Sequence, residues 1–217
     1  MKGLRTDGKA TDRVEAFSDG IFSVAITLLI LEFKVPELPD AAGNADLLAA
    51  LSGLWPSALA LVISFFTVLI MWVNHHGFFE LLADVDPRLL FANGFLLLMI
   101  TVVPFPTAVL ARYVKSQSAN AAAAVYCGTY VAINVGYNLL WYSSAHNRRL
   151  IKPEIPDAHL RKVRNAYLLA FPVYVSAVAV SFLTAYAGLA ICMALWVLWA
   201  RLRYAPEGDA ANGQAKA

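Results

Sequence analysis

Residues 13–31 read RVEAFSDGIFSVAITLLIL, and this stretch decides the fold. A polar beginning with Arg13, Glu15 and Asp19 runs into a largely apolar segment that starts at Ile21. A helix needs roughly 20 residues to cross a hydrocarbon core of about 30 Å, because each residue adds about 1.5 Å. The stretch is therefore predicted to be a membrane-spanning helix.

The composition of the whole chain agrees with a membrane protein. Only 15% of its 217 residues are charged, whereas 59% are hydrophobic. A soluble domain carries roughly 25% charged residues, so this chain has too little polar surface for water. A net charge of +2 does not point to a nucleic-acid partner. Cys127 and Cys192 lie in apolar runs, where a thiol acts as a small hydrophobe, and no disulfide framework is expected.

Hydropathy predicts an all-α, polytopic membrane protein with six spans in a single domain over residues 1–217. The expected spans are residues 13–33, 56–79, 88–112, 119–143, 164–186 and 187–202. A very short turn around Ala187-Gly188 is expected to separate the last two. Residues 40–54 could hold a short surface helix, and the tail at 205–217 is expected to be disordered.

The basic residues predict the orientation of the chain. With six spans both termini lie on one side, and all 17 lysines and arginines except Lys34, Arg112 and Lys115 fall on that side. Such residues concentrate in cytoplasmic segments, so residues 1–12 and the C-terminus are predicted to be cytoplasmic, in a plasma or inner membrane. Acidic residues among the first 19, with no small-x-small cleavage site, favour a retained first span over a cleaved leader.

Helical periodicity divides the first span into two neighbouring stripes. Asp19 lies about 9 Å along the axis from Arg13, and a carboxylate at that depth needs a partner or water. Asp19 shares one stripe with Ser23 and Ile26. The other stripe is small or apolar and contains Gly20, Val24, Thr27 and Leu31, with Leu28 beside it.

Three segments resemble the endolysosomal potassium channel family and its bacterial homologues. Residues 13–20 match the RxxxFSDG signature of that family through Arg13, Phe17, Ser18, Asp19 and Gly20. Trp72 and His75 resemble its WxxH element, and the segment from Asn93 to Pro104-Phe105 resembles its third-span element. The segments occur in the family's order and cover about half of the chain.

The resemblance implies a passive potassium channel built from four copies of a six-helix subunit, with membrane lipids as its other neighbours. In that family the first helix lines the pore, and a hydrophobic constriction replaces a carbonyl-lined filter. Position matching puts the constriction at Val24, with Thr27, Leu28 and Leu31 as further layers. Valine at 24 departs from the commoner isoleucine or leucine and implies a slightly wider neck.

The resemblance also implies that the remaining matched residues hold the pore helix in place. Arg13, Ser18, Asp19, His75 and Trp72 are expected to form a polar network that fixes the first helix against the second and third without touching the ion. No cofactor or resident metal is expected, since potassium ions only pass through.

Several alternatives remain open at this level. Val24, Thr27 and Leu31 could serve ordinary packing or lipid contact, and Asp19 could be structural or could touch an ion. Asp19 could instead bind a coupling proton or cation in a secondary transporter, and a scaffold without transport is a third class.

Two local patterns carry less weight than the first span. His75-His76 with Glu80 offers too few ligands for a metal site, so a polar network or interface is favoured. Residues 135–138, VGYN, look like a potassium-filter sequence but fall in the middle of a predicted span. The chain lacks GxSxG, HExxH and Walker patterns, so an enzyme is not predicted.

Overall fold

The computed structural model describes residues 9–202. The first eight residues of the expected cytoplasmic segment, and the tail expected to be disordered, lie outside the described residues. The described part forms eight α-helices and two short 3₁₀ helices. They are α1 Lys9–Leu28, η1 Leu29–Glu32, α2 Asn44–Gly53, α3 Trp55–Glu80, α4 Pro87–Val102, α5 Pro104–Tyr113, α6 Ala119–Ala145, η2 His146–Arg148, α7 Asp157–Ser181 and α8 Ala185–Arg201.

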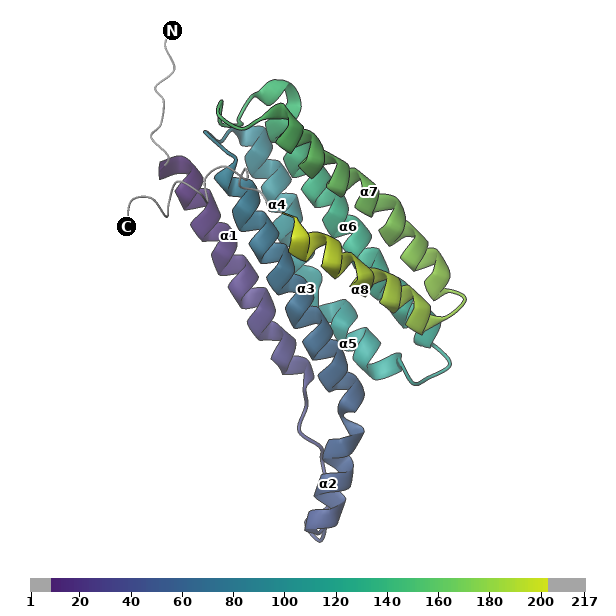
Figure 1. The fold of residues 1–217 in the computed structure, drawn as a ribbon. Coiled ribbons are helices and arrows are strands. Elements are labelled where there is room, and N and C mark those ends of the chain that lie inside the picture. The colour runs from purple at the N-terminus through teal and green to yellow at the C-terminus, as the bar shows by residue number, and fades with distance from the viewer. Residues whose placement is uncertain (1–8, 203–217) are drawn as a thin grey trace, which may run out of the picture.

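The long helices run up and down in one elongated bundle (Figure 1). α1 lies at an edge and packs against α3 and α4, whereas α6 is central and contacts α4, α5, α7 and α8. The short helix α2 projects beyond the end of the bundle at which α1 ends (Figure 1). Among residues 9–202 there is no β-strand, only an isolated bridge that pairs Leu82 with Ile151.

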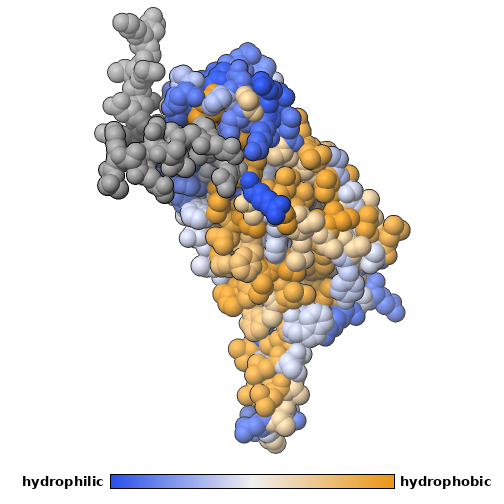
Figure 2. Space-filling model, in the orientation of Figure 1, coloured by the Kyte–Doolittle hydropathy of each residue, from blue (hydrophilic) through white to orange (hydrophobic). Residues whose placement is uncertain are grey.

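The ends of the bundle differ from its middle. Figure 2 shows an orange apolar belt over the body of the molecule and a blue hydrophilic cap where α4 and α7 begin. We call this cap the basic end, since Arg88, Arg148 and Arg149 lie there. An apolar belt between polar ends is the surface that a bilayer-spanning bundle requires.

Within residues 9–202, four helical segments are long and apolar enough to cross a membrane: Ala10–Leu31, Trp55–Glu80, Pro87–Tyr113 and Asp157–Ser181. The six-span count therefore stays a prediction. α6 has 27 residues, or about 40 Å, but carries Asn134 and several tyrosines. Its central position explains this composition, because Asn134 and Tyr137 are buried against protein rather than lipid. α8 has 17 residues.

A proline interrupts the third predicted span. The ring of Pro104 removes one backbone donor and clashes with the preceding turn, which explains why α4 ends at Val102 and α5 begins at Pro104. Val103 between them keeps helical dihedral angles, so the two helices still form one apolar segment.

The last connection differs from the expectation. The turn lies at residues 182–184, and Ala187-Gly188 lies inside α8, so the predicted boundary was wrong. Gly188 is a packing position: a Cβ there would lie 2.8 Å from the Ala177 carbonyl oxygen and 2.9 Å from the Ser181 Cβ of α7. Glycine thus permits close contact between α7 and α8 instead of ending a helix.

Candidate functional site

α1 has one buried face and one exposed face. The buried face points at α3 and α4 and contains Ser18, Phe22 and Ala25, and Leu29 at the start of η1 continues it. Its spacing of three and four residues is that of a single helical face. The opposite face has no partner among residues 9–202 because α1 lies at the edge of the bundle (Figure 1).

The stripe predicted from the sequence occupies this exposed face. Val24 is 55% exposed and Leu31 is 65% exposed, and Gly20, Thr27 and Leu28 are also exposed. The Thr27 hydroxyl donates to the Val24 carbonyl oxygen of its own helix over 2.9 Å. We call Gly20, Val24, Thr27, Leu28 and Leu31 the exposed stripe.

The helix changes pitch within this stripe. α1 ends at Leu28, and Leu29–Glu32 continues as a 3₁₀ helix. A 3₁₀ helix turns about 120° per residue, against about 100° for an α-helix, so Leu31 is rotated away from the position that an α-helix would give it. Val24 and Leu28 remain on regular α-helix.

A buried chain of hydrogen bonds joins α1 to α4 and α3. The Asn93 side-chain nitrogen donates to the Ser18 hydroxyl over 2.9 Å, and the His75 Nε2 lies 2.9 Å from Asn93 Oδ1. An amide oxygen only accepts, so Nε2 of His75 carries the proton in this arrangement. All three side chains are almost fully buried, and Ser18 also donates to the Val14 carbonyl oxygen.

A second polar link joins α1 to α3. The Trp72 indole N–H donates to Asp19 Oδ1 over 2.8 Å, at a position where Asp19 is half-buried. The structure thus brings together Ser18, Asp19, Trp72, His75 and Asn93. Arg13 is exposed instead, and with Phe17 it lines an open groove of about 540 Å³ between α1 and α4.

Sequence reasoning missed Glu15 as a partner of His76. The His76 Nδ1 lies 2.5 Å from Glu15 Oε1, and its Nε2 lies 3.8 Å from Glu80 Oε1. His76 was singled out only with Glu80, one turn away on the same helix, because a contact between residues 61 apart leaves no local signal. Residues 9–202 contain no group of three or more potential ligands arranged to hold a metal ion.

The VGYN segment lies in the middle of α6. Gly136 packs so closely against α4 that a Cβ would lie 3.1 Å from the Leu96 Cα. The Tyr137 hydroxyl donates to the Met71 carbonyl oxygen of α3 over 2.6 Å. These contacts give both residues a role in helix packing.

The described part of the chain is an all-helical bundle with several helices long enough to cross a membrane, and hydrogen bonds join its first helix to α3 and α4. These features define a polytopic membrane protein. Residues 13–104 match the family described as "Endosomal/lysosomal potassium channel TMEM175". A protein of Chamaesiphon minutus named a potassium channel is 41% identical over 190 residues, which are 88% of this chain and 93% of that protein. The chain belongs to the TMEM175 family, whose members are ion channels and not enzymes.

Other relatives agree with this assignment. A protein of Streptomyces collinus, also named a potassium channel, is 42% identical over 80% of this chain and 83% of its own length. The crystal structure of a lysosomal potassium-selective channel TMEM175 homologue from Chamaesiphon minutus superposes with a TM-score of 0.78 at 40% identity, covering 88% of this chain and 96% of that one. A structure of the potassium channel MtTMEM175 has a TM-score of 0.56 at 20% identity and shares the fold.

Proposed function

We propose that the chain is one subunit of a homotetrameric, potassium-selective channel whose pore is lined by α1. The observation that carries the proposal is the exposed stripe: branched aliphatic side chains face outward on the helix whose other face is fixed by buried polar contacts. Four such stripes around a central axis make rings at Val24, Leu28 and Leu31. Relatives named potassium channels support the choice of ion.

The ring at Val24 is the proposed constriction. A ring of aliphatic side chains repels water, so an ion that passes must give up part of its hydration shell. Potassium gives up water more readily than sodium, and the neck therefore prefers potassium. Valine is smaller than leucine or isoleucine, so we expect a modest preference. The pore needs no cofactor, since the ions only pass through.

The polar contacts on the other face of α1 keep the neck at a defined width. Ser18 is bonded through Asn93 to His75, and Asp19 is bonded to Trp72. These bonds lie one to two turns from Val24 and join α1 to two different helices. A pore helix held in this way resists the rotation that would turn Val24 out of the axis.

The proposed topology has six spans with both termini in the cytoplasm of a cell membrane. α6 and α8 then complete the six, and the basic end faces the cytoplasm. Arg88 and Arg149, which are exposed, and Arg148, which is half-buried, support this orientation by the positive-inside rule.

The secondary-transporter alternative depends on Asp19 as an ion or proton carrier. Its Oδ1 already accepts the Trp72 N–H within the same subunit, which favours a structural role. The two functions also differ in rate, because a channel conducts orders of magnitude more ions than a transporter can carry.

A flux assay tests the proposal. The purified chain is reconstituted into liposomes, and uptake is measured with a potassium gradient and separately with a sodium gradient. We expect rapid potassium uptake, slower sodium uptake and single-channel currents in planar bilayers. Native mass spectrometry of the detergent-solubilised protein is expected to give the mass of four copies. Slow, saturable flux without unitary currents would instead identify a transporter, and a monomeric mass would rule out the shared pore.

A further inference from the structure

A second groove lies on the far side of α4 from α1, at the basic end. It has a volume of about 510 Å³ and opens between α4 and α6. Its lining includes Arg88, Phe91 and Phe95 of α4, Leu139 and Tyr142 of α6, and Arg149. We call it the α4–α6 groove.

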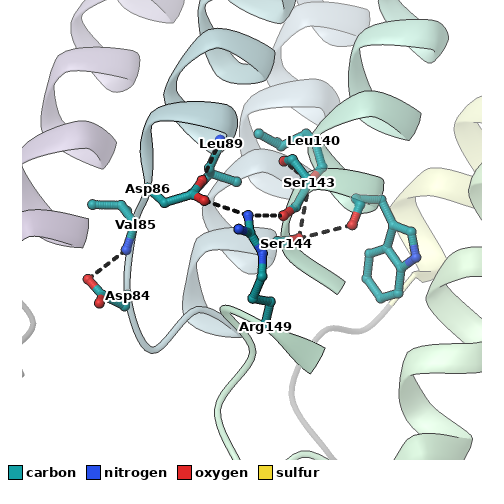
Figure 3. Close-up of polar contacts among 9 residues, drawn as sticks. Asp84, Val85, Asp86, Leu89, Leu140, Ser143, Ser144 and Arg149 are labelled. Atoms are coloured by element: carbon teal, nitrogen blue, oxygen red, sulfur yellow. Dashed lines mark hydrogen bonds and ion pairs between the residues drawn. The ribbon is translucent and has the colours of Figure 1, made fainter. Parts of the chain in front are cut away.

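The mouth of the groove is basic. Arg149 donates through Nη2 to Asp86 Oδ2 over 2.5 Å and to the Ser143 carbonyl oxygen over 3.2 Å, which holds its guanidinium at the beginning of α4 (Figure 3). Asp86 is itself fixed, because its Oδ1 caps α4 by accepting the Leu89 N–H. Arg88 is exposed and makes no ion pair within residues 9–202.

The wall of the groove is apolar and continues toward the middle of the bundle. Phe91 is 83% exposed, and Phe95, Leu98 and Val102 follow it along α4 at helical spacing. From Phe91 to Val102 this row measures about 16 Å, close to half of a hydrocarbon core of about 30 Å. Leu139 of α6 is also exposed and lines the other side.

We infer that the α4–α6 groove binds one anionic phospholipid, with its phosphate beside Arg88 and Arg149 and one acyl chain along Phe91 and Phe95. Basic pockets between membrane helices are typical sites for anionic headgroups. The charge of Arg88 favours an anionic over a neutral headgroup. The apolar row favours a lipid over free phosphate, because an acyl chain can cover the exposed phenylalanines and inorganic phosphate cannot. The inference rests on the membrane-spanning fold and not on the proposed pore.

The experiment compares lipids on the purified full chain by native mass spectrometry and thermal melting. Phosphatidylglycerol and phosphatidylcholine with identical acyl chains are the probes. The wild-type chain is expected to retain phosphatidylglycerol preferentially and to melt at a higher temperature with it. Removing one basic group is expected to weaken phosphatidylglycerol binding about fivefold, so Arg88→Gln should lose most of the preference.

Arg112→Gln is the matched control. Arg112 is an exposed arginine in the last turn of α5, at the other end of the bundle from the basic end, and it does not line the groove. It should bind both lipids as the wild type does. If Arg88→Gln fails to give a monodisperse protein, Arg88→Lys replaces it and should keep the preference. The lipid preference of the wild-type chain remains decisive in either case.

Four results would overturn the inference. One is equal retention of the two lipids by the wild-type chain, and another is an unchanged preference in Arg88→Gln. The third is displacement of phosphatidylglycerol by millimolar inorganic phosphate, which would identify a free-anion site. A Phe91→Cys chain that crosslinks to a second copy within the tetramer would show that protein covers the groove and would also contradict it. None of these readouts depends on ion flux. A failure of the lipid inference can therefore be distinguished from a failure of the pore proposal, which is tested by flux.

Discussion

The indole N–H of Trp72 donates a 2.8 Å hydrogen bond to the carboxylate of Asp19, which ties α1 to α3 one turn before Val24. A half-buried carboxylate that loses its donor pays a desolvation penalty of about 1–3 kcal/mol. Trp72→Phe is therefore expected to lower stability by about that amount, measured as thermal or denaturant unfolding in detergent. Trp55→Phe is the control, because Trp55 is exposed at the start of α3.

A double variant separates the hydrogen bond from other effects of the tryptophan. Removing both partners is less costly than orphaning one. Trp72→Phe combined with Asp19→Ala should thus lose less stability than the sum of the two single variants. Strict additivity would mean that the bond contributes nothing. Asp19→Ala alone is expected to lower the yield of tetramer, and normal assembly with normal currents would contradict that role.

Asn93 of α4 is hydrogen-bonded both to Ser18 of α1 and to His75 of α3. Its loss should therefore lower stability more than the loss of Ser18. Asn93→Ala leaves the buried His75 Nε2 without its acceptor and removes the donor to the Ser18 hydroxyl, which keeps only its bond to the Val14 carbonyl oxygen. The expected cost of losing both Asn93 bonds is about 2–4 kcal/mol. Ser18→Ala leaves the bond between Asn93 and His75 in place and deprives only the Asn93 side-chain nitrogen of its partner on α1, so it should cost less. Unfolding curves that rank Ser18→Ala below Asn93→Ala in stability would contradict this arrangement.

Asp86 should keep the basic end intact down to acid pH. Partial burial alone raises the pKa of Asp86, but hydrogen bonds from the Leu89 N–H and Arg149 outweigh it and hold the pKa below its ordinary value of 3.8. A lowered carboxyl pKa adds stability that is fully present above pH 3.8 and is lost as the pH falls through the folded-state pKa. Melting of the wild type should therefore lose this contribution only below pH 3.8.

Substitutions at Asp86 separate its cap from its charge. Asp86→Ala removes the N-cap of α4 and should cost about 1 kcal/mol at neutral pH. Asp86→Asn keeps a capping oxygen and should cost less. The stability difference between wild type and Asp86→Ala should shrink at acid pH, and a difference that stays constant from pH 7 to pH 3 would speak against the carboxylate.

Gly188 should tolerate no side chain. A Cβ there would lie 1.9 Å from the Ser181 hydroxyl oxygen as well as close to the backbone of α7, so Gly188→Ala should destabilise by about 1–3 kcal/mol through overpacking. Gly128→Ala is a matched control, because a Cβ at 128 meets nothing within 4 Å and should add about 0.5–1 kcal/mol. Equal melting of the two variants would show that α7 and α8 are not in close contact.

Much of this fold follows from the sequence because apolar length and helical period are local properties. The first helix, the short helix α2 and the helical nature of the VGYN segment all agree with the pattern of residues. The faces of α1 also follow the predicted period, with the stripe around Val24 exposed and Ser18 buried.

Features that depend on contacts between distant segments could not be predicted. Residues 164–202 are apolar almost throughout, so hydropathy offers no boundary, and Gly188 resembles a helix stop although it serves packing. The pairing of His76 with Glu15 and the exposure of Arg13 depend on how α1 sits against its neighbours. The 3₁₀ helix that follows Leu28 has no residue signal in this stretch.

The most direct test of the account is potassium and sodium flux through liposomes that contain Val24→Ala or Val24→Asn. Val24 is largely exposed in the subunit, so neither change should impair its folding. Alanine should widen the neck and asparagine should wet it, so both should speed sodium flux and reduce the preference for potassium. Val125→Ala, at a similarly exposed valine on α6, should behave as wild type. If both Val24 variants match the wild type in rate and ion preference, α1 does not line the pore at this residue.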